Sequence, residues 1–271
     1  MRKGYIAMVL LAGIALLSSY YAFFDRSGSV KKYSPETPKS IKRVYHNNKS
    51  DIRAILVSGP GSDVDEQRFR MSNDFAEKYL KSIGVNEIYS YHYDSKNPEK
   101  LSGELLGKMR DVLSVAEDHD VTLITFASHG NGEGIILSKK ENNKYGMSYD
   151  KLASILDDID GYKIAIIQAC NADALVENMF TYGKYSVFGK DCKLPHNSVV
   201  LAAASDSNRN EQTTFCAGNE SDYIPRFLKA LKEYHNVEKA FKESWNSSDR
   251  PTMHTSVPNM KELNGILNNK N

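Results

Sequence analysis

The chain has 271 residues, of which 41% are hydrophobic and 25% charged, an ordinary globular composition with room for one large core or two small ones. Its formal net charge of +1 gives no whole-chain field that would favour nucleic acid or an acidic substrate as the partner.

The first 24 residues have the composition of a targeting segment. Arg2 and Lys3 precede an apolar run that begins at Tyr5 and ends at Leu17, about the length of a signal-peptide hydrophobic region. Aromatic residues extend this run to Phe24, which brings it to about the length of a membrane-spanning helix. We therefore expect residues 1–24 to be a signal peptide or a membrane anchor. The rest of the protein would then be exported, either anchored facing outside the cytoplasm or, after cleavage, secreted or periplasmic.

Residues 25–50 are rich in Ser, Pro, Lys and Asn and lack apolar periodicity, which predicts a linker. Between Arg26 and Arg53 there are eight Lys or Arg residues and two acidic residues. Such a stretch would contact anionic lipid head groups, although a solvated linker is the simpler interpretation. By the positive-inside rule this basic flank favours the opposite orientation, with the following domain in the cytoplasm.

Apolar runs and helical periodicity alternate from residue 51 onward. Short β-rich or continuously apolar runs predict strands, at residues 52–57, 87–93, 121–127, 163–169 and 198–204. Apolar residues at helical spacing predict helices, over residues 71–83, 101–116, 148–159 and 221–234. Gly84 would end the first of these helices, and Ser148 would cap the third.

This alternation predicts an α/β fold, a mostly parallel sheet with helices on both faces. We expect one such domain over residues 51–249, a reasonable size for a single domain. Residues 250–271 are Asn-rich and predict a polar, mobile tail, in which residues 252–257 would be able to add an edge strand.

Two of the predicted strands are followed directly by residues whose side chains can act in catalysis. Residues 121–127 lead to Ser128, His129 and Gly130, and residues 163–169 lead to Cys170. If the two strands are neighbours, His129 and Cys170 project from the same carboxyl edge of the sheet. There the imidazole would act as general base for the thiol nucleophile. The backbone N–H groups of Gly130 and Cys170 would form the oxyanion hole.

Cys170 has two further features of a reactive cysteine. A helix is expected to begin near Ala172, and a helix N-terminus lowers the pKa of a thiol by stabilising the anion. The chain has three cysteines, so in an oxidising compartment one thiol is left over. Cys192 and Cys216 can pair and leave Cys170, but the sequence alone does not decide the pairing.

The two blocks resemble the catalytic blocks of caspases and legumains. Residues 128–130 and 133–136 (SHG and EGII) are similar to their His-Gly block, and residues 166–170 (IIQAC) to their Cys block. The caspase signature is Q-A-C-[RQG]-G with the histidine about 50 residues upstream. Here the separation is 41 residues, and residues 171–172 (NA) depart from the signature. The departure favours the legumain-type branch, and the resemblance covers roughly residues 50–245.

The resemblance also implies a substrate pocket. Arg70, at the start of an amphipathic stretch, is similar to the legumain arginine that lines the primary specificity pocket, and Ser205 lies in a segment similar to another wall. With Gln168 of the cysteine block, the implied substrate-binding residues are Arg70, Gln168 and Ser205. Because a guanidinium binds carboxylate and amide oxygens, cleavage after Asn or Asp is expected.

Other roles are possible for the residues that the resemblance assigns to this pocket. Arg70 would also be able to pair with Asp74 one helical turn away. Glu133 or Asp206 would instead be able to line a pocket for a basic residue. Legumains carry a histidine-orienting Asn just before the pocket arginine, and here that position is Arg68. The resemblance therefore implies a two-residue dyad, as in caspases.

Taken together, the resemblance implies a cysteine endopeptidase that acts on peptide or protein substrates without a cofactor or metal. One alternative is a transamidase or ligase with the same thioester chemistry, as in the legumain relatives that attach glycolipid anchors. Another is a catalytically inactive, membrane-tethered binding module on the same fold. A zinc site at Cys192 and His196 lacks a second ligand pair at zinc spacing, and the sequence has no nucleotide-binding glycine motif.

Overall fold

The computed structural model describes residues 50–85, 87–97, 100–131, 134–138, 146–170, 172, 194–203, 217–246 and 251–269. The chain from Lys49 to Asn271 groups into one compact unit. The expected targeting segment, most of the linker, Cys192, Ser205 and Cys216 lie outside the described residues. Of the helices in the described ranges, none combines the length and the apolar character needed to cross a membrane.

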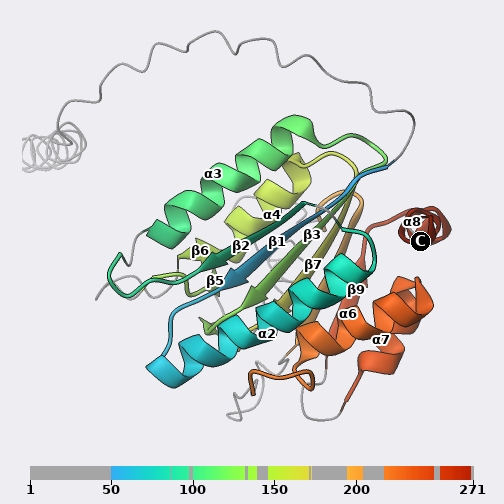
Figure 1. Cartoon of the computed structure of the whole chain (residues 1–271). Coiled ribbons are helices and arrows are strands. Elements are labelled where there is room, and N and C mark those ends of the chain that lie inside the picture. The colour runs from blue at the N-terminus through green and yellow to red at the C-terminus, as the bar shows by residue number, and fades with distance from the viewer. Residues whose placement is uncertain are drawn as a thin grey trace, which may run out of the picture. The chain divides into compact units, whose positions relative to one another are not determined.

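A six-stranded sheet forms the centre of this unit (Figure 1). Its strands lie in the order β2-β1-β3-β7-β8-β9. Every neighbouring pair is parallel except β8 with β9. The bounds are Ile52–Ser58 for β1, Glu87–His92 for β2, Val121–Ala127 for β3, Tyr162–Gln168 for β7, Ser198–Ala203 for β8 and Thr252–Thr255 for β9. The predicted α/β fold with a mostly parallel sheet is confirmed.

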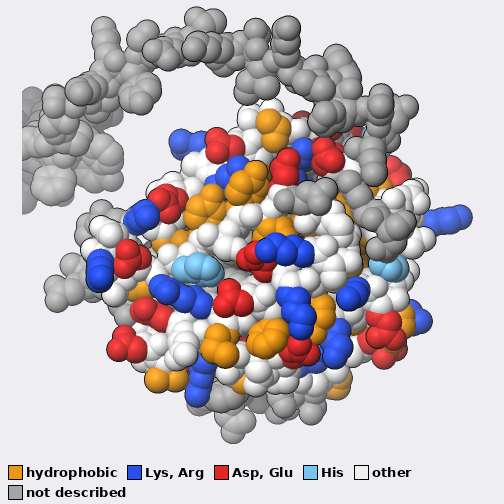
Figure 2. All heavy atoms as spheres, in the orientation of Figure 1, with side chains coloured by type: hydrophobic (Ala, Val, Ile, Leu, Met, Phe, Trp, Pro, Cys, Tyr) orange, Lys and Arg blue, Asp and Glu red, His pale blue; other side chains and the backbone are white. Residues whose placement is uncertain are grey.

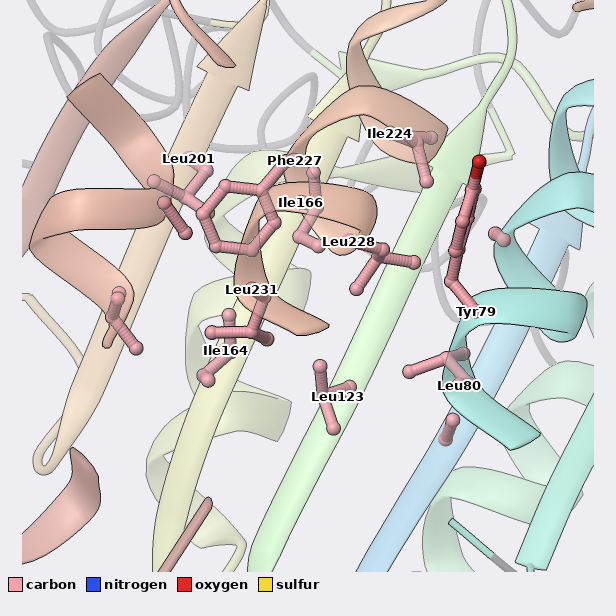
Figure 3. Packing of buried hydrophobic residues seen from close by; sticks show 14 of the residues in the cluster. Tyr79, Leu80, Leu123, Ile164, Ile166, Leu201, Ile224, Phe227, Leu228 and Leu231 are labelled. Carbon is pink, nitrogen blue, oxygen red and sulfur yellow. The ribbon is translucent and has the colours of Figure 1, made fainter. Parts of the chain in front are cut away.

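Helices cover both faces of the sheet, as expected for central strands whose residues are all buried. One apolar core contains residues of α2 (Asp63–Ser82), α6 (Tyr223–Tyr234), α7 (Val237–Ser244) and α8 (Met260–Asn268). The other contains residues of α3 (Lys100–Val115) and α4 (Tyr149–Asp158). Figure 3 shows the first core, where side chains of α2 and α6 meet those of β3, β7 and β8: Tyr79, Leu80, Leu123, Ile164, Ile166, Leu201, Ile224, Phe227, Leu228 and Leu231.

A second, small sheet follows β3 directly. It consists of β4 (Gly130–Asn131), β5 (Gly134–Ile135) and β6 (Met147–Ser148), all antiparallel. The ladder begins at His129, whose carbonyl accepts a hydrogen bond of 2.9 Å from the Ile136 N–H. The segment that carries His129 is therefore held between the end of a central strand and a three-stranded sheet.

Helix α2 begins well before the expected residue 71. Its N-cap is Ser62, whose hydroxyl accepts the Asp65 N–H at 3.2 Å while the Asp65 carboxylate accepts the Ser62 N–H at 3.2 Å. This reciprocal pair is a capping box, a local signal that needs no apolar periodicity. The first two turns were not predicted because only Phe69 among their residues is buried. The predicted cap of α4 at Ser148 is confirmed.

The C-terminal segment differs from the expected mobile tail. Residues 252–255 form β9, the antiparallel edge strand next to β8, which confirms the edge strand considered from the sequence. Helix α8 then buries Leu263 and Leu267 in the core. With Met260 and Ile266 these two residues make an apolar pattern of only about two turns, too short to stand out against the Asn-rich composition.

Candidate active site

His129 and Cys170 lie at the ends of neighbouring strands. Strands β3 and β7 pair in register, with Ala127 opposite Gln168, and each candidate residue follows two positions later. The ladder continues past the strand ends, because the Ser128 N–H donates to the Gln168 carbonyl at 3.2 Å. The structure thus brings together the two residues that the sequence predicted as a catalytic pair.

The two side chains are hydrogen-bonded to each other, and this bond raises the pKa of His129 above its ordinary value. Partial burial of the ring opposes the effect, and the charge of Asp65 adds to it. Cys170 is partly exposed and is not in a disulfide, and the His129 side chain is 44% exposed. An imidazole and a thiol in contact, both reachable from solvent, can exchange a proton and meet a substrate.

The imidazole ring is held by contacts from helix α2. The Phe69 ring meets it edge to face, with centroids 5.3 Å apart and planes at 83°. On the chain before His129, the Ser128 hydroxyl donates to the Ile136 carbonyl at 2.6 Å, which ties the strand end to the small sheet. The ring orientation therefore depends on both α2 and the small sheet.

Gly130 packs directly on the backbone of Cys170. A Cβ at this position would lie 2.6 Å from the Cys170 carbonyl oxygen and 3.0 Å from the Ala169 Cβ. Only a residue without a side chain fits so close an approach. This places the Gly130 main chain beside Cys170, as an oxyanion hole built from these two residues would require, and that role stays a prediction.

A third residue at the site was not found from the sequence. The Asp65 Oδ2 atom lies 3.5 Å from His129 Nε2. The same carboxylate accepts the Ser62 hydroxyl at 2.7 Å, and the bonds from Ser62, followed by the charge of His129, lower the pKa of Asp65. The available signal was the S-x-x-D spacing of a capping box at residues 62–65.

Arg70 is anchored at the end of another strand. Its Nη2 donates to the Tyr93 carbonyl at 2.5 Å, just beyond β2. In the sheet, β1 and β3 lie between β2 and β7, the strand that Cys170 follows. The Arg70 side chain is exposed. Arg70 directly follows Phe69, so it lies on the same helix, α2, as the residue that contacts the His129 ring. Its role in substrate binding stays a prediction.

Gln168 and Ser205 are the other two residues predicted to bind substrate. Gln168 is 1% exposed, and its side-chain carbonyl accepts the Ile224 N–H at 3.2 Å, which links the end of β7 to the first turn of α6. Its side-chain Nε2 has no hydrogen-bond partner among the described residues. A substrate-binding role for Gln168 stays a prediction, and Ser205 lies outside the described residues.

No family model and no curated protein sequence matches this chain. In the described part of the chain, no group of three or more His, Cys, Asp or Glu side chains is placed to hold a metal ion.

On the face drawn in Figure 2, acidic and basic side chains are interspersed, in keeping with the net charge near zero.

Proposed function

We propose that the chain is a cysteine endopeptidase with His129 and Cys170 as its catalytic dyad. The observation that supports this most is the hydrogen bond between the two side chains at adjoining carboxyl ends of β3 and β7. Active groups of open parallel sheets gather at this edge. The resemblance to caspases and legumains in residues 128–136 and 166–170 favours the same fold and the legumain-type branch.

In the proposed reaction His129 removes the Cys170 proton, and the thiolate attacks the carbonyl carbon of the scissile peptide bond. The carbonyl oxygen becomes an oxyanion, which the N–H groups of Gly130 and Cys170 would bind. The tetrahedral adduct collapses, the C–N bond breaks, and His129 returns its proton to the leaving amine. Water, deprotonated by His129, then attacks the thioester and releases the acid product with regeneration of the thiol.

We also propose that the bond cleaved follows Asn or Asp, with Arg70, Gln168 and Ser205 binding that residue. A guanidinium has several N–H donors in a fixed fork, and it binds carboxylate and amide oxygens. The bond from Arg70 to the Tyr93 carbonyl uses one of these donors and would hold the group in place.

The test is a panel of fluorogenic peptides that differ only in the residue before the scissile bond, applied to the purified full-length protein. We expect turnover of Asn or Asp peptides, and its complete loss in Cys170→Ala. Cys192→Ala and Cys216→Ala are matched controls, because they remove a thiol elsewhere and should leave turnover in place. Undiminished turnover in Cys170→Ala would overturn the peptidase assignment, and cleavage only after Lys or Arg would overturn the specificity.

A further inference from the structure

We infer that Asp65 is a positioning residue for His129 and makes the catalytic pair a triad, an inference that rests on the proposed function. Its carboxylate Oδ2 lies 3.5 Å from His129 Nε2. With Nε2 next to Asp65, Nδ1 is the ring nitrogen that would exchange the proton with Cys170 in this inference. A carboxylate in this position selects the tautomer of the neutral imidazole and stabilises the imidazolium when it forms.

The capping box of α2 fixes the direction of this carboxylate. Its Oδ2 accepts both the Ser62 hydroxyl at 2.7 Å and the Ser62 N–H at 3.2 Å. The Asp65 N–H in turn donates to the Ser62 hydroxyl at 3.2 Å. Because these bonds define the helix start, the carboxylate does not have to be ordered again when the imidazole becomes charged.

Because Gly61 has no side chain, there is space for the contact between Asp65 and His129. A Cβ at position 61 would lie 2.5 Å from the Asp65 Cβ and 3.2 Å from His129 Nε2. Any side chain there would separate the two groups or move the helix start. The turn before α2 is therefore shaped to bring a carboxylate to the ring.

The charge of Asp65 also offsets an unfavourable field. A helix N-terminus has a partial positive charge, which disfavours a cation placed next to it. His129 lies at the N-terminal end of α2, since it contacts Asp65 in the first turn and Phe69 one turn later. Without a carboxylate the helix would lower the pKa of the imidazole, whereas with Asp65 the charged form is favoured.

The test compares Asp65→Asn with the parent and with Asp63→Asn, in the full-length protein. Both variants remove one negative charge from the first turn of α2, and Asp63 lies two residues away from the His129 contact. Asparagine keeps an oxygen that can accept the Ser62 bonds, and Asp65→Gln, the neutral residue found in capping boxes, is a second variant. Thermal melting confirms that each variant is folded.

Two measurements are made across about pH 5 to 9, the range in which histidine titrates. The first is kcat/KM for the best peptide of the panel. The second is the rate at which iodoacetamide alkylates Cys170, resolved by mass spectrometry of its peptide, which needs no substrate. Because Asp65 stabilises the imidazolium, its neutral variants should lose the charged form at lower pH. We expect the alkaline limb of kcat/KM to move down by about half a pH unit, the size of a partly exposed ion pair.

In the same variants, alkylation of Cys170 near pH 6 should slow by about threefold, because the charged His129 ring stabilises a smaller fraction of Cys170 as thiolate. Asp63→Asn should leave both profiles in place. The inference fails if Asp65→Asn and Asp65→Gln fold and give the same two profiles as Asp63→Asn. A parent protein without peptidase activity would reject the proposed function alone, since the alkylation profile still reports whether Asp65 acts on His129.

Discussion

Gly130 lies closer to the Cys170 carbonyl than a residue with a side chain permits. A Cβ there would come within 2.6 Å of that oxygen, so Gly130→Ala must push apart the segments that carry His129 and Cys170. We expect kcat/KM to fall at least about 100-fold, the effect of losing one oxyanion-hole donor. Steady-state kinetics measure the loss, and circular dichroism shows that the variant is folded.

The matched control is Gly107→Ala on helix α3, where a Cβ would meet nothing within 4 Å. This change should leave kcat/KM as it is and raise the free energy of unfolding by up to about 1 kcal/mol, the helix preference of Ala over Gly. Parental kcat/KM in Gly130→Ala would show that the close approach at Cys170 has no part in the reaction.

Single residues differed in how far the sequence predicted them. The neighbouring positions of His129 and Cys170 were predictable because each follows an apolar strand, and parallel strands end at one edge of the sheet. Asp65 was not, because its signal is a polar helix cap and its contact with His129 joins positions far apart in the chain. The bond of Arg70 to the Tyr93 carbonyl is equally non-local and has no counterpart in residue spacing.

At the scale of elements, helix α2 is fastened to the sheet by a buried polar network. The Asn73 side chain donates to the Ser58 hydroxyl at 2.8 Å and accepts from the Thr125 hydroxyl at 3.1 Å. The Ser58 hydroxyl donates in turn to the Phe69 carbonyl at 3.1 Å. These bonds join α2 to β1 and β3, and they fix the position of Phe69 against the His129 ring.

We therefore expect Asn73→Ala to lower the free energy of unfolding by about 3 kcal/mol, because the buried Thr125 hydroxyl loses its acceptor and the buried Ser58 hydroxyl loses a donor. Urea denaturation measures this. The fraction that stays folded should also lose activity, since α2 is free to shift at the site. Asp74→Ala, an exposed change next to it, should stay within about 0.5 kcal/mol of the parent. Equal midpoints for the two variants would refute this account of the network.

Elements were predictable where their pattern is long and apolar. The central strands were placed to within a residue at their starts because both faces are buried and nearly every position is apolar. The start of α2 was missed for the opposite reason, because its residues are mostly polar, and α8 was missed because its apolar pattern spans only about two turns. There the helix depends on a cap, or on two leucines that pack against distant parts of the chain.

At the scale of the whole molecule, the buried ion pairs of Arg53 and the pair His129 and Cys170 lie at opposite edges of the sheet. At the amino edge Arg53, 6% exposed, binds Asp120 at 2.6 Å and Glu87 at 2.9 Å. These residues lie at the starts of β1, β3 and β2, whereas His129 and Cys170 follow the opposite strand ends. Stability and reactivity should therefore be separable by mutation.

Arg53→Ala tests this separation. It leaves the buried Asp120 carboxylate without its cationic partner, so the free energy of unfolding should fall by about 3 to 5 kcal/mol. At a temperature where the variant is folded, kcat per titrated active site should equal that of the parent. Lys78→Ala, which removes an exposed pair with Glu220, should change neither quantity. A large drop in kcat per site would show that the two edges are coupled.

The edge strand β9 and helix α8 have a consequence for the order in which the molecule assembles. Leu263 and Leu267 belong to the same core as Ile52 of the first strand and Phe69 of α2. That core stays open until the ribosome has released residues from both ends of the unit, and contacts between such distant positions form slowly. The nascent chain would therefore close this core last, after β9 and α8 have left the ribosome, whereas Ala169 and Ala172 beside Cys170 belong to the other core.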